Sequence, residues 1–174
     1  NALAHIGGNL AFGHAARSGR SDLAIANGRV VVDGNLSQYA NSTYAYTIGD
    51  GPSVGGGIAV TGAATILDGA QLAVRFDGAV SMGDQFVVLD ADGGVTGAYA
   101  LLNGGQLSAF FGIDALYDPN TVSIVVTSSQ DFADVVATPN QVATAEGLQS
   151  LGSGNPLYGT ILNIATEDEA RLAF

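Results

Sequence analysis

Short apolar runs separated by turn residues make up the chain as far as Gln130. Each run is too short for a helix, and every glycine between the runs disfavours helix by about 1 kcal/mol relative to alanine. Pairs such as Asp33-Gly34 and Asp68-Gly69 tolerate the positive φ angles of tight turns. The pattern therefore predicts strands over Asn9–Phe12, Leu23–Ile25, Arg29–Val32, Thr43–Ile48, Ile58–Val60, Thr65–Leu67, Gln71–Phe76, Gln85–Leu89, Tyr99–Leu102 and Val122–Thr127.

The spacing of these strands indicates that they stack on one another in successive coils. Val60, Leu67 and Val74 recur at intervals of seven residues, and Gly62 and Gly69 follow the first two at matching points. Strands this short bury too little surface alone, so each must pack on neighbouring strands. Sandwiches with Greek-key connections share the same turn chemistry, and the periodicity leaves both architectures open.

Side-chain alternation predicts which positions face the interior. Along a strand, every second side chain points to the same face of the sheet. The residues of Gln71–Phe76 that are predicted to face inward are Leu72, Val74 and Phe76. Arg75 is predicted to face outward, and Leu89 is assigned to an inward position in its own strand.

The pattern changes from strand to helix near Thr138. Thr138 is a predicted N-cap, Pro139 suits the first helical position, and Gln141 closes a capping box. Apolar residues then recur at helical spacing and predict one buried stripe. The stripe consists of Val142, Ala145, Leu148 and Leu151. The sequence Gly152–Asn155 is predicted to end this helix.

Two further helices are predicted after this point. Pro156 opens a second helix that carries Leu157, and Thr166–Glu169 forms another capping box that starts a third. Isolated helices shorter than roughly 12 residues are marginal in water. The third helix is therefore expected to have a mobile end unless Leu172 and Phe174 find a hydrophobic groove.

The net charge of the chain limits which classes of molecule are expected to bind it. The chain has 5 arginines, no lysine and 16 acidic residues, which gives a formal net charge of -11. No basic residue lies between Arg75 and Arg171, so nucleic acid and anionic membrane surfaces would be repelled along that stretch. No apolar run approaches the roughly 20 residues of a membrane-spanning helix, so no transmembrane segment is predicted.

The residues offer little support for catalysis or cofactor binding. The chain has no cysteine, which removes thiolate chemistry, and its two histidines, His5 and His14, lack a third ligand at a recognisable spacing. Asp90–Gly93 begins like a calcium loop, but the later ligand positions of that motif are not filled. We therefore predict no enzyme activity, no metal and no cofactor.

Aromatic residues support either a core or a ligand-binding surface. Tyr39, Tyr44 and Tyr46 lie close together in sequence, and an exposed set of this kind would bind carbohydrate or a protein. The core interpretation is favoured because aromatic ladders are common in stacked strands. The residues expected to form a hydrophobic plug in the last coils are Phe110, Phe111, Leu116 and Tyr117.

Three segments resemble one family, the autotransporters of type V secretion. They are Phe86–Tyr99, Leu116–Val126, and Ala137–Gln141 followed by Leu148, Leu151 and Gly154–Tyr158. They stand in the order and spacing found near the C-terminus of autotransporter passengers, and the resemblance covers roughly 42–174.

The resemblance implies an all-β fold, the end of a right-handed parallel β-helix with a hairpin-like cap and a short C-terminal helical segment. It divides the chain into β-helix coils at 1–41, autochaperone-like terminal coils and cap at 42–130, and a helical linker at 131–174. The residues assigned to the cap and linker are Phe86, Tyr99, Phe110, Phe111, Tyr117, Thr138, Pro139, Gln141, Leu148, Leu151, Pro156, Leu157 and Tyr158.

The function that follows from the resemblance is structural. The chain is expected to be the stem and folding template of a passenger on the surface of a Gram-negative bacterium, or released from it. Its expected partners are upstream passenger coils and an outer-membrane β-barrel that would follow Phe174, which is then expected to be a cut end. The alternative is a surface adhesin or self-assembling module that binds a protein or carbohydrate.

Overall fold

A computed structural model describes residues 2–13, 20–26, 28–49, 57–77, 80–105, 107–152, 155–164 and 166–174. The strands are β1 (Ala2–Ile6), β2 (Leu10–Phe12), β3 (Ser21–Ala26), β4 (Gly28–Val32), β5 (Leu36–Gln38), β6 (Ser42–Gly49), β7 (Gly57–Val60), β8 (Ala64–Ile66), β9 (Gln71–Asp77), β10 (Gln85–Ala91), β11 (Val95–Thr96), β12 (Ala100–Leu101), β13 (Phe111–Tyr117) and β14 (Thr121–Ser128). The helices are α1 (Pro139–Gln149), α2 (Pro156–Leu162) and α3 (Glu167–Ala173), with short 3₁₀ helices η1 (Leu102–Gly105) and η2 (Phe132–Val135).

The chain forms two compact units. The sheet unit contains Asn1–Ala79, Gln85–Gly105 and Ala115–Val125. The helical unit contains Val80–Asp84, Gln106–Asp114 and Val126–Phe174. The functional division at 1–41, 42–130 and 131–174 stays a prediction.

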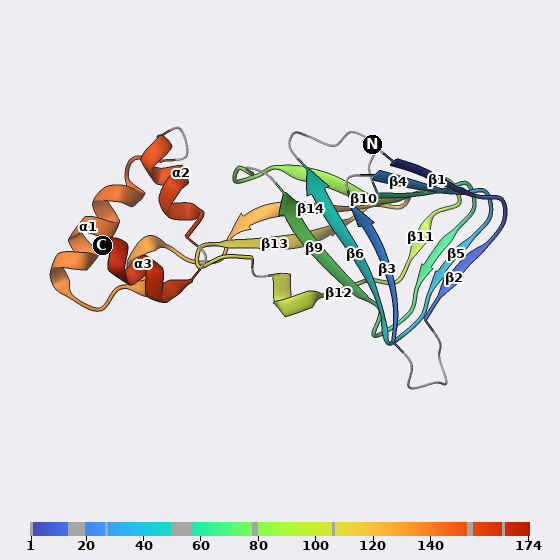
Figure 1. The fold of residues 1–174 in the computed structure, drawn as a ribbon, viewed down its shortest axis with the longest axis horizontal. Coiled ribbons are helices and arrows are strands. Elements are labelled where there is room, and N and C mark those ends of the chain that lie inside the picture. Colours follow the sequence, from blue (N-terminus) through green and yellow to red (C-terminus); the bar gives the residue numbers. More distant parts are fainter. Residues whose placement is uncertain are drawn as a thin grey trace. The chain divides into compact units, whose positions relative to one another are not determined.

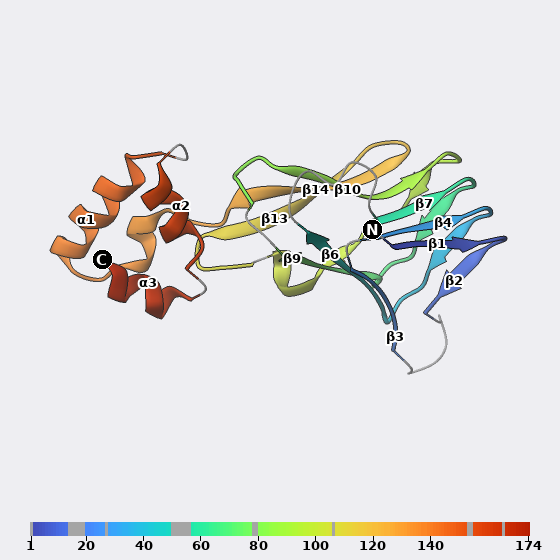
Figure 2. The same ribbon diagram turned by 45° about the horizontal axis from the view of Figure 1, so that its top comes forward.

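In the sheet unit, strands β1 to β12 pair with the strand three positions before or after them in the chain. Sheet 1 has the order β1-β4-β7-β10-β14-β13, sheet 2 the order β11-β8-β5-β2, and sheet 3 the order β12-β9-β6-β3. Strands β3, β6 and β9 run side by side, as do β1, β4 and β7 (Figures 1 and 2). Consecutive groups of three strands therefore form four layers, the first made of β1–β3 and the last of β10–β12.

Parallel register stacks apolar residues of successive layers into columns. In sheet 1, Ile6 pairs with Val32, Val32 with Val60, and Val60 with Ala91. In sheet 3 one column is built from Leu23, Tyr44, Leu72 and Leu101. These columns form the core, because a side chain covered by its counterparts above and below is removed from water.

The inward and outward assignments are confirmed for the strand that begins at Gln71. Leu72 and Val74 are buried, Arg75 is exposed, and Phe76 is half-buried with its ring 5.4 Å from that of Phe86. Leu89 is also buried, as predicted.

All ten predicted strands overlap a strand of the structure, and four strands are additional. The additional strands are β1, β5, β11 and β13. Two of them, β5 and β11, have only three and two residues, too few to show an alternating pattern. In β13, Gly112 and Asp114 interrupt the apolar run, which hides it from a search based on periodicity.

The predicted all-β fold, the end of a right-handed parallel β-helix, is wrong. The chain has mixed α/β content, with three sheets rich in parallel pairs and three helices in the described part. Sheet 1 is mixed, because β10 pairs in parallel with β7 and antiparallel with β14. A turn at Asp118, whose backbone N–H donates to Thr121 O at 2.9 Å, precedes β14 and changes the chain direction.

Local capping signals in the sequence mark the start of each of the three helices. Each begins at a residue whose side chain accepts a hydrogen bond from the first turn, and two of the three have proline in that turn. No helix in the described part of the chain is long and apolar enough to cross a membrane.

Val74→Asp tests the packing of the sheet unit. Val74 pairs with Tyr46 in the core, so the substitution would bury a carboxylate without a partner. The expected cost is about 3–5 kcal/mol of unfolding free energy, measured by chemical denaturation. Arg75→Asp, at the exposed neighbouring position, is the matched control and should change stability by less than about 1 kcal/mol. Equal stability of the two variants would contradict the register described above.

Candidate functional site

The first layer presents three strands whose outer sides have no partner strand among the described residues. β1, β2 and β3 each stand at one end of their sheet. We call these three strands the open edge. An edge strand offers unpaired backbone N–H and C=O groups, to which a further strand can add.

Inward side chains of the open edge are less covered than those of the second layer. Ile6, Leu10, Phe12 and Leu23 are only half-buried. Their register partners Val32, Leu36, Gln38 and Tyr44 are at most 1% exposed. The difference arises because the second layer is covered from both sides and the first from one side only. The open edge therefore combines unpaired backbone with partly uncovered apolar side chains.

Charged pairs lie on the outward face of the open edge. His5 Nε2 lies 2.8 Å from Asp33 Oδ1, and Arg20 Nε lies 2.9 Å from Asp22 Oδ1. The hydrogen bond from Arg20 lowers the pKa of Asp22 below its ordinary value. Both pairs are solvent-exposed, so each adds little stability. Charges on edge strands limit unselective pairing with other chains.

A tyrosine cluster fills the interior of the sheet unit. The Tyr44 ring lies 6.1 Å from that of Tyr46 and 6.3 Å from that of Tyr99, and Tyr44 Oη donates to Val88 O at 3.0 Å. Tyr44 and Tyr46 are buried, so they belong to the core and offer no ligand surface. Burial raises the pKa of both Tyr44 and Tyr99 above the ordinary value for tyrosine.

The cap residues from the sheet unit have structural partners. Phe86 is buried against Phe76, and Tyr99 is buried as well. Tyr117 is 40% exposed, and its Oη accepts a hydrogen bond from Tyr99 N at 2.7 Å. Leu116 is exposed to a similar extent, so of the four residues expected to form a plug only Phe110 and Phe111 are fully buried.

Four aromatic rings form the core of the helical unit. Phe132 is the central one, with its ring 4.8 Å from Phe110, 5.0 Å from Tyr158 and 6.0 Å from Phe174. Phe110 and Tyr158 are among the predicted cap and linker residues, whereas Phe132 is not. Phe132 lies in η2, just before the first predicted helix, where its isolated position gave no periodic signal.

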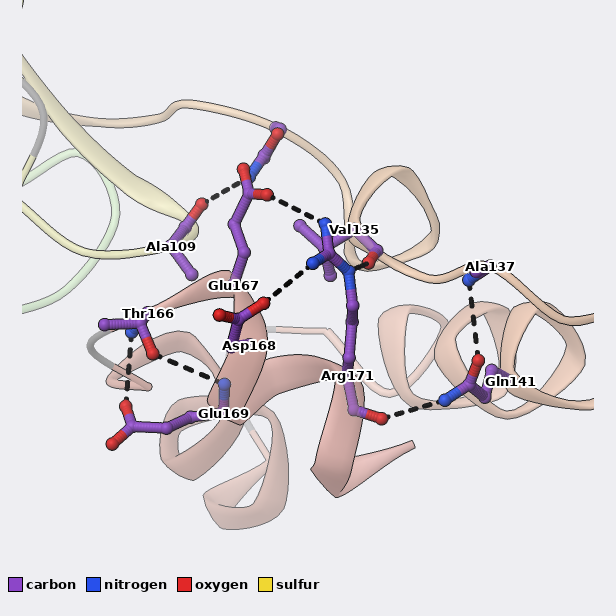
Figure 3. Close-up of polar contacts among 10 residues, drawn as sticks. Ala109, Val135, Ala137, Gln141, Thr166, Glu167, Asp168, Glu169 and Arg171 are labelled. Atoms are coloured by element: carbon purple, nitrogen blue, oxygen red, sulfur yellow. Dashed lines mark hydrogen bonds and ion pairs between the residues drawn. The ribbon is translucent and has the colours of Figure 1, made fainter.

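The predicted helix caps are present. Thr138 Oγ1 accepts from Gln141 N at 3.3 Å, Gln141 Oε1 accepts from Thr138 N at 3.2 Å, and Pro139 occupies the first turn of α1. At α3 the reciprocal pair is Thr166 with Glu169 (Figure 3). Pro156 opens α2 after its N-cap Asn155.

The predicted leucine stripe is only partly buried. Ala145 is buried and Leu148 is half-buried, whereas Leu151 is exposed. In α2 the exposed residue Leu157 precedes the buried Tyr158. Because Ile161 and Leu162 of α2 are buried, the helical core combines aromatic rings with these aliphatic residues.

Arg171 joins α3 to η2. Its Nε donates to Val135 O at 2.7 Å, Nη1 to Asp168 Oδ1 at 2.8 Å, and Nη2 to Glu167 Oε2 at 3.2 Å (Figure 3). The Arg171 carbonyl oxygen in turn accepts from Gln141 Nε2 of α1 at 2.8 Å. Three segments of the helical unit therefore meet at this residue. The sequence signal for this role is the spacing of Arg171, which follows Asp168 by three positions and Glu167 by four.

The end of α3 is held by one of the two residues expected to anchor it. Phe174 packs on Phe110 and Phe132, with ring centroids 6.4 and 6.0 Å away. Leu172 is 88% exposed and makes no such contact. The ring of Phe174 thus supplies the tertiary contact that a helix of this length needs.

Potential metal ligands are scattered in the described residues, where no group of three histidine or acidic side chains lies together. His5 pairs with Asp33, and His14 lies outside the described residues. No protein-family model matches this sequence, and no curated protein matches it. The resemblance to autotransporters stays a prediction that rests on the three sequence segments.

Alkaline pH should destabilise the sheet unit through its buried tyrosines. In the unfolded chain a tyrosine ionises near pH 10, whereas Tyr44 in the folded state keeps its proton to higher pH. Above about pH 10 the unfolded chain therefore binds fewer protons, and the unfolding free energy falls by up to about 1.4 kcal/mol per pH unit for each such group. Tyr44→Phe removes one group and should make this fall less steep. Denaturation at several pH values, with tyrosinate absorbance followed in parallel, measures it; the same slope in both proteins would contradict the assignment.

Arg171→Met tests the junction in the helical unit. The variant keeps the aliphatic stem and loses the three donated hydrogen bonds. Because the side chain is 45% exposed, the expected cost is only about 1–2 kcal/mol, seen as faster amide exchange in α3. Asp168→Asn weakens a single exposed partner and should cost less than about 0.5 kcal/mol. A larger effect of Asp168→Asn than of Arg171→Met would refute the assigned role.

Proposed function

We propose that this chain is the non-catalytic stem and folding template of a passenger of the autotransporter type, displayed on or released from a Gram-negative cell. The observation that carries the proposal is the open edge, with its unpaired backbone and half-buried inward side chains. The segments Phe86–Tyr99, Leu116–Val126 and Ala137–Tyr158 support the family assignment.

The open edge favours the addition of a further layer. The columns that end at Ile6, Leu10 and Leu23 continue in register through the layers below. A segment that pairs with β1–β3 would cover these side chains and satisfy the free backbone groups together. In stacked architectures each unit is stabilised mainly by its neighbour, so a folded layer lowers the barrier for the next one.

The opposite ends of sheets 2 and 3 are less suited to growth than the open edge. In sheet 1, β14 covers the outer side of β10, and the seven-residue strand β13 stands at the end. In sheets 2 and 3 the last strands, β11 and β12, have two residues each. Very short edge strands are one way in which proteins limit further pairing. In sheets 2 and 3, growth by strand addition is therefore directed to the first layer.

The direction of strand addition agrees with the order in which the passenger is expected to be exported. In the proposed mechanism the export pore delivers the passenger with its C-terminus first, so this chain folds before the segments upstream of it. A folded stem also opposes return through a narrow pore. The net charge of -11 keeps the glycine-rich chain soluble during this process. The proposed partners are upstream passenger segments and an outer-membrane barrel.

Leu23→Lys in the full-length precursor tests the proposal. Leu23 is a half-buried inward residue of β3, and a lysine there places an unpaired charge where the next layer would pack. The expected result is a passenger that remains protease-sensitive upstream of this chain when expressed in a Gram-negative host. Ala24→Lys, at the exposed neighbouring position of the same strand, is the control and should leave the passenger resistant.

Two results would contradict the proposal. Equal protease resistance of the Leu23→Lys and Ala24→Lys precursors would show that the open edge does not template folding. A reading frame that continues past Phe174 without an outer-membrane barrel would refute the family assignment. Light scattering adds a third measurement, because concentration-dependent oligomers abolished by Leu23→Lys would indicate a self-assembling module instead.

A further inference from the structure

The corner between sheets 1 and 2 repeats one hydrogen-bond pattern from layer to layer. In the second and third layers, three consecutive backbone N–H groups donate to the preceding layer, and in the fourth layer two do, Asp92 N to Val60 O and Gly93 N to Gly62 O. In the second layer, Asp33 N donates to Ile6 O at 3.0 Å, Gly34 N to Gly8 O at 3.1 Å, and Asn35 N to Asn9 Oδ1 at 2.8 Å. The equivalent bonds of the third layer run from Thr61 N to Val32 O, Gly62 N to Gly34 O, and Ala63 N to Asn35 Oδ1.

In the second and third layers, the third of these N–H groups donates to an asparagine side chain. Asn9 and Asn35 occupy the same corner position in successive layers, and each reaches the layer that follows it. Ala63 holds this position in the third layer and has no side-chain acceptor. The next donor, Gly94 N, accordingly turns to Ala91 O of its own layer at 2.9 Å. The side chain at this corner position therefore decides only the third hydrogen bond between two layers.

Glycine precedes each of these positions because the preceding layer approaches closely, and at Gly93 a Cβ would meet the backbone of Gly62 and Ala63. A Cβ at Gly34 would collide with Asn9 Oδ1, and one at Gly62 would collide with Asn35 Oδ1. Gly8 is the equivalent residue of the first layer, and a Cβ there would meet nothing within 4 Å. Among the described residues, none fills the space above Gly8 that an asparagine fills above Gly34 and Gly62.

The backbone N–H groups at the corner of the first layer also lack the acceptors that the preceding layer supplies in the second and third layers. Gly7 N and Asn9 N have no hydrogen-bond partner among the described residues, and Gly8 N donates to Ile6 O within its own turn at 2.9 Å. The corner of the open edge therefore presents two donors without acceptors, Gly7 N and Asn9 N, at the positions of Asp33 N and Asn35 N in the second layer.

We propose that the open edge selects a polypeptide segment made of two short strands joined by a Gly-Asn corner, with the asparagine side chain bound to Asn9 N above Gly8. This inference rests on the proposed function and specifies the partner: the strands supply affinity, and the corner asparagine sets the register. Apolar residues of the segment cover Ile6 and Leu10, as Val32 and Leu36 do in the second layer.

A synthetic peptide with the sequence of residues 28–49 is the probe, because it carries two strands joined by Gly34-Asn35 and the third strand of one layer. Added to the full chain, it should slow amide exchange throughout β1 and β2 and at Gly7 and Asn9. The matched control is the same peptide with N35A. It should still protect β1, but it should leave Asn9 N unprotected and bind about fivefold more weakly, as expected for one lost hydrogen bond.

Variants of the full chain test the receiving side. G8A puts a methyl group where the incoming asparagine oxygen would lie, so binding of the unmodified peptide should fall at least about fivefold. G7A is the control, because Asp33 and Thr61 show that side chains are accepted at the equivalent positions of later layers. Gly8 has a φ of +151°, so circular dichroism should verify that G8A keeps the fold.

The outcomes separate this inference from the proposed function. Equal affinity and equal Asn9 protection with both peptides would overturn the role of the asparagine and leave strand addition standing. Failure of both peptides to protect β1 would overturn the inference and remove the support for a templating edge as well. Protection by the unmodified peptide, with the losses described for N35A and G8A, supports the selection of a Gly-Asn corner.

Discussion

Parallel register between successive layers is the constraint on which the sheet unit depends. It sets Ile6 against Val32 and Val32 against Val60, so that each apolar side chain is covered by a counterpart at the same position of the next layer. A slip of one residue would turn every inward side chain toward solvent. The corners must then repeat at matching positions, which is why Gly34 and Gly62 lie beneath asparagine side chains. Core packing and corner hydrogen bonds specify the same register independently.

The helical unit is organised in a different way. Its helices start from local capping signals at Thr138, Asn155 and Thr166, and such short helices need tertiary contacts to persist. Those contacts are supplied by the rings around Phe132 and by the bonds of Arg171 to Val135. The aromatic rings and one arginine thus add to an aliphatic core that includes the buried residues Ile161 and Leu162.

Sequence patterns were informative where a physical signal is local. Alternation located Leu72 and Val74 correctly, and the capping boxes located the starts of α1 and α3. Features that depend on distant residues were missed or misjudged: the aromatic core around Phe132, the antiparallel pairing of β14 with β10, and the mixed content of the fold. The corner asparagines were not recognised, because Asn9 and Asn35 come together only through the register of strands far apart in sequence.

The asparagines at the corners give each layer two different faces. Asn35 accepts from Ala63 N on one side, while its own backbone N–H donates to Asn9 on the other. A layer with this corner is therefore a self-similar module: inserted between two others, it would offer each neighbour the same donors and acceptors as the layer it displaced. Gene duplication of one layer would lengthen the sheet unit in fixed steps without the invention of a new interface. Ala63 ends that equivalence, so lengthening of this kind is confined to the side of the chain that precedes it.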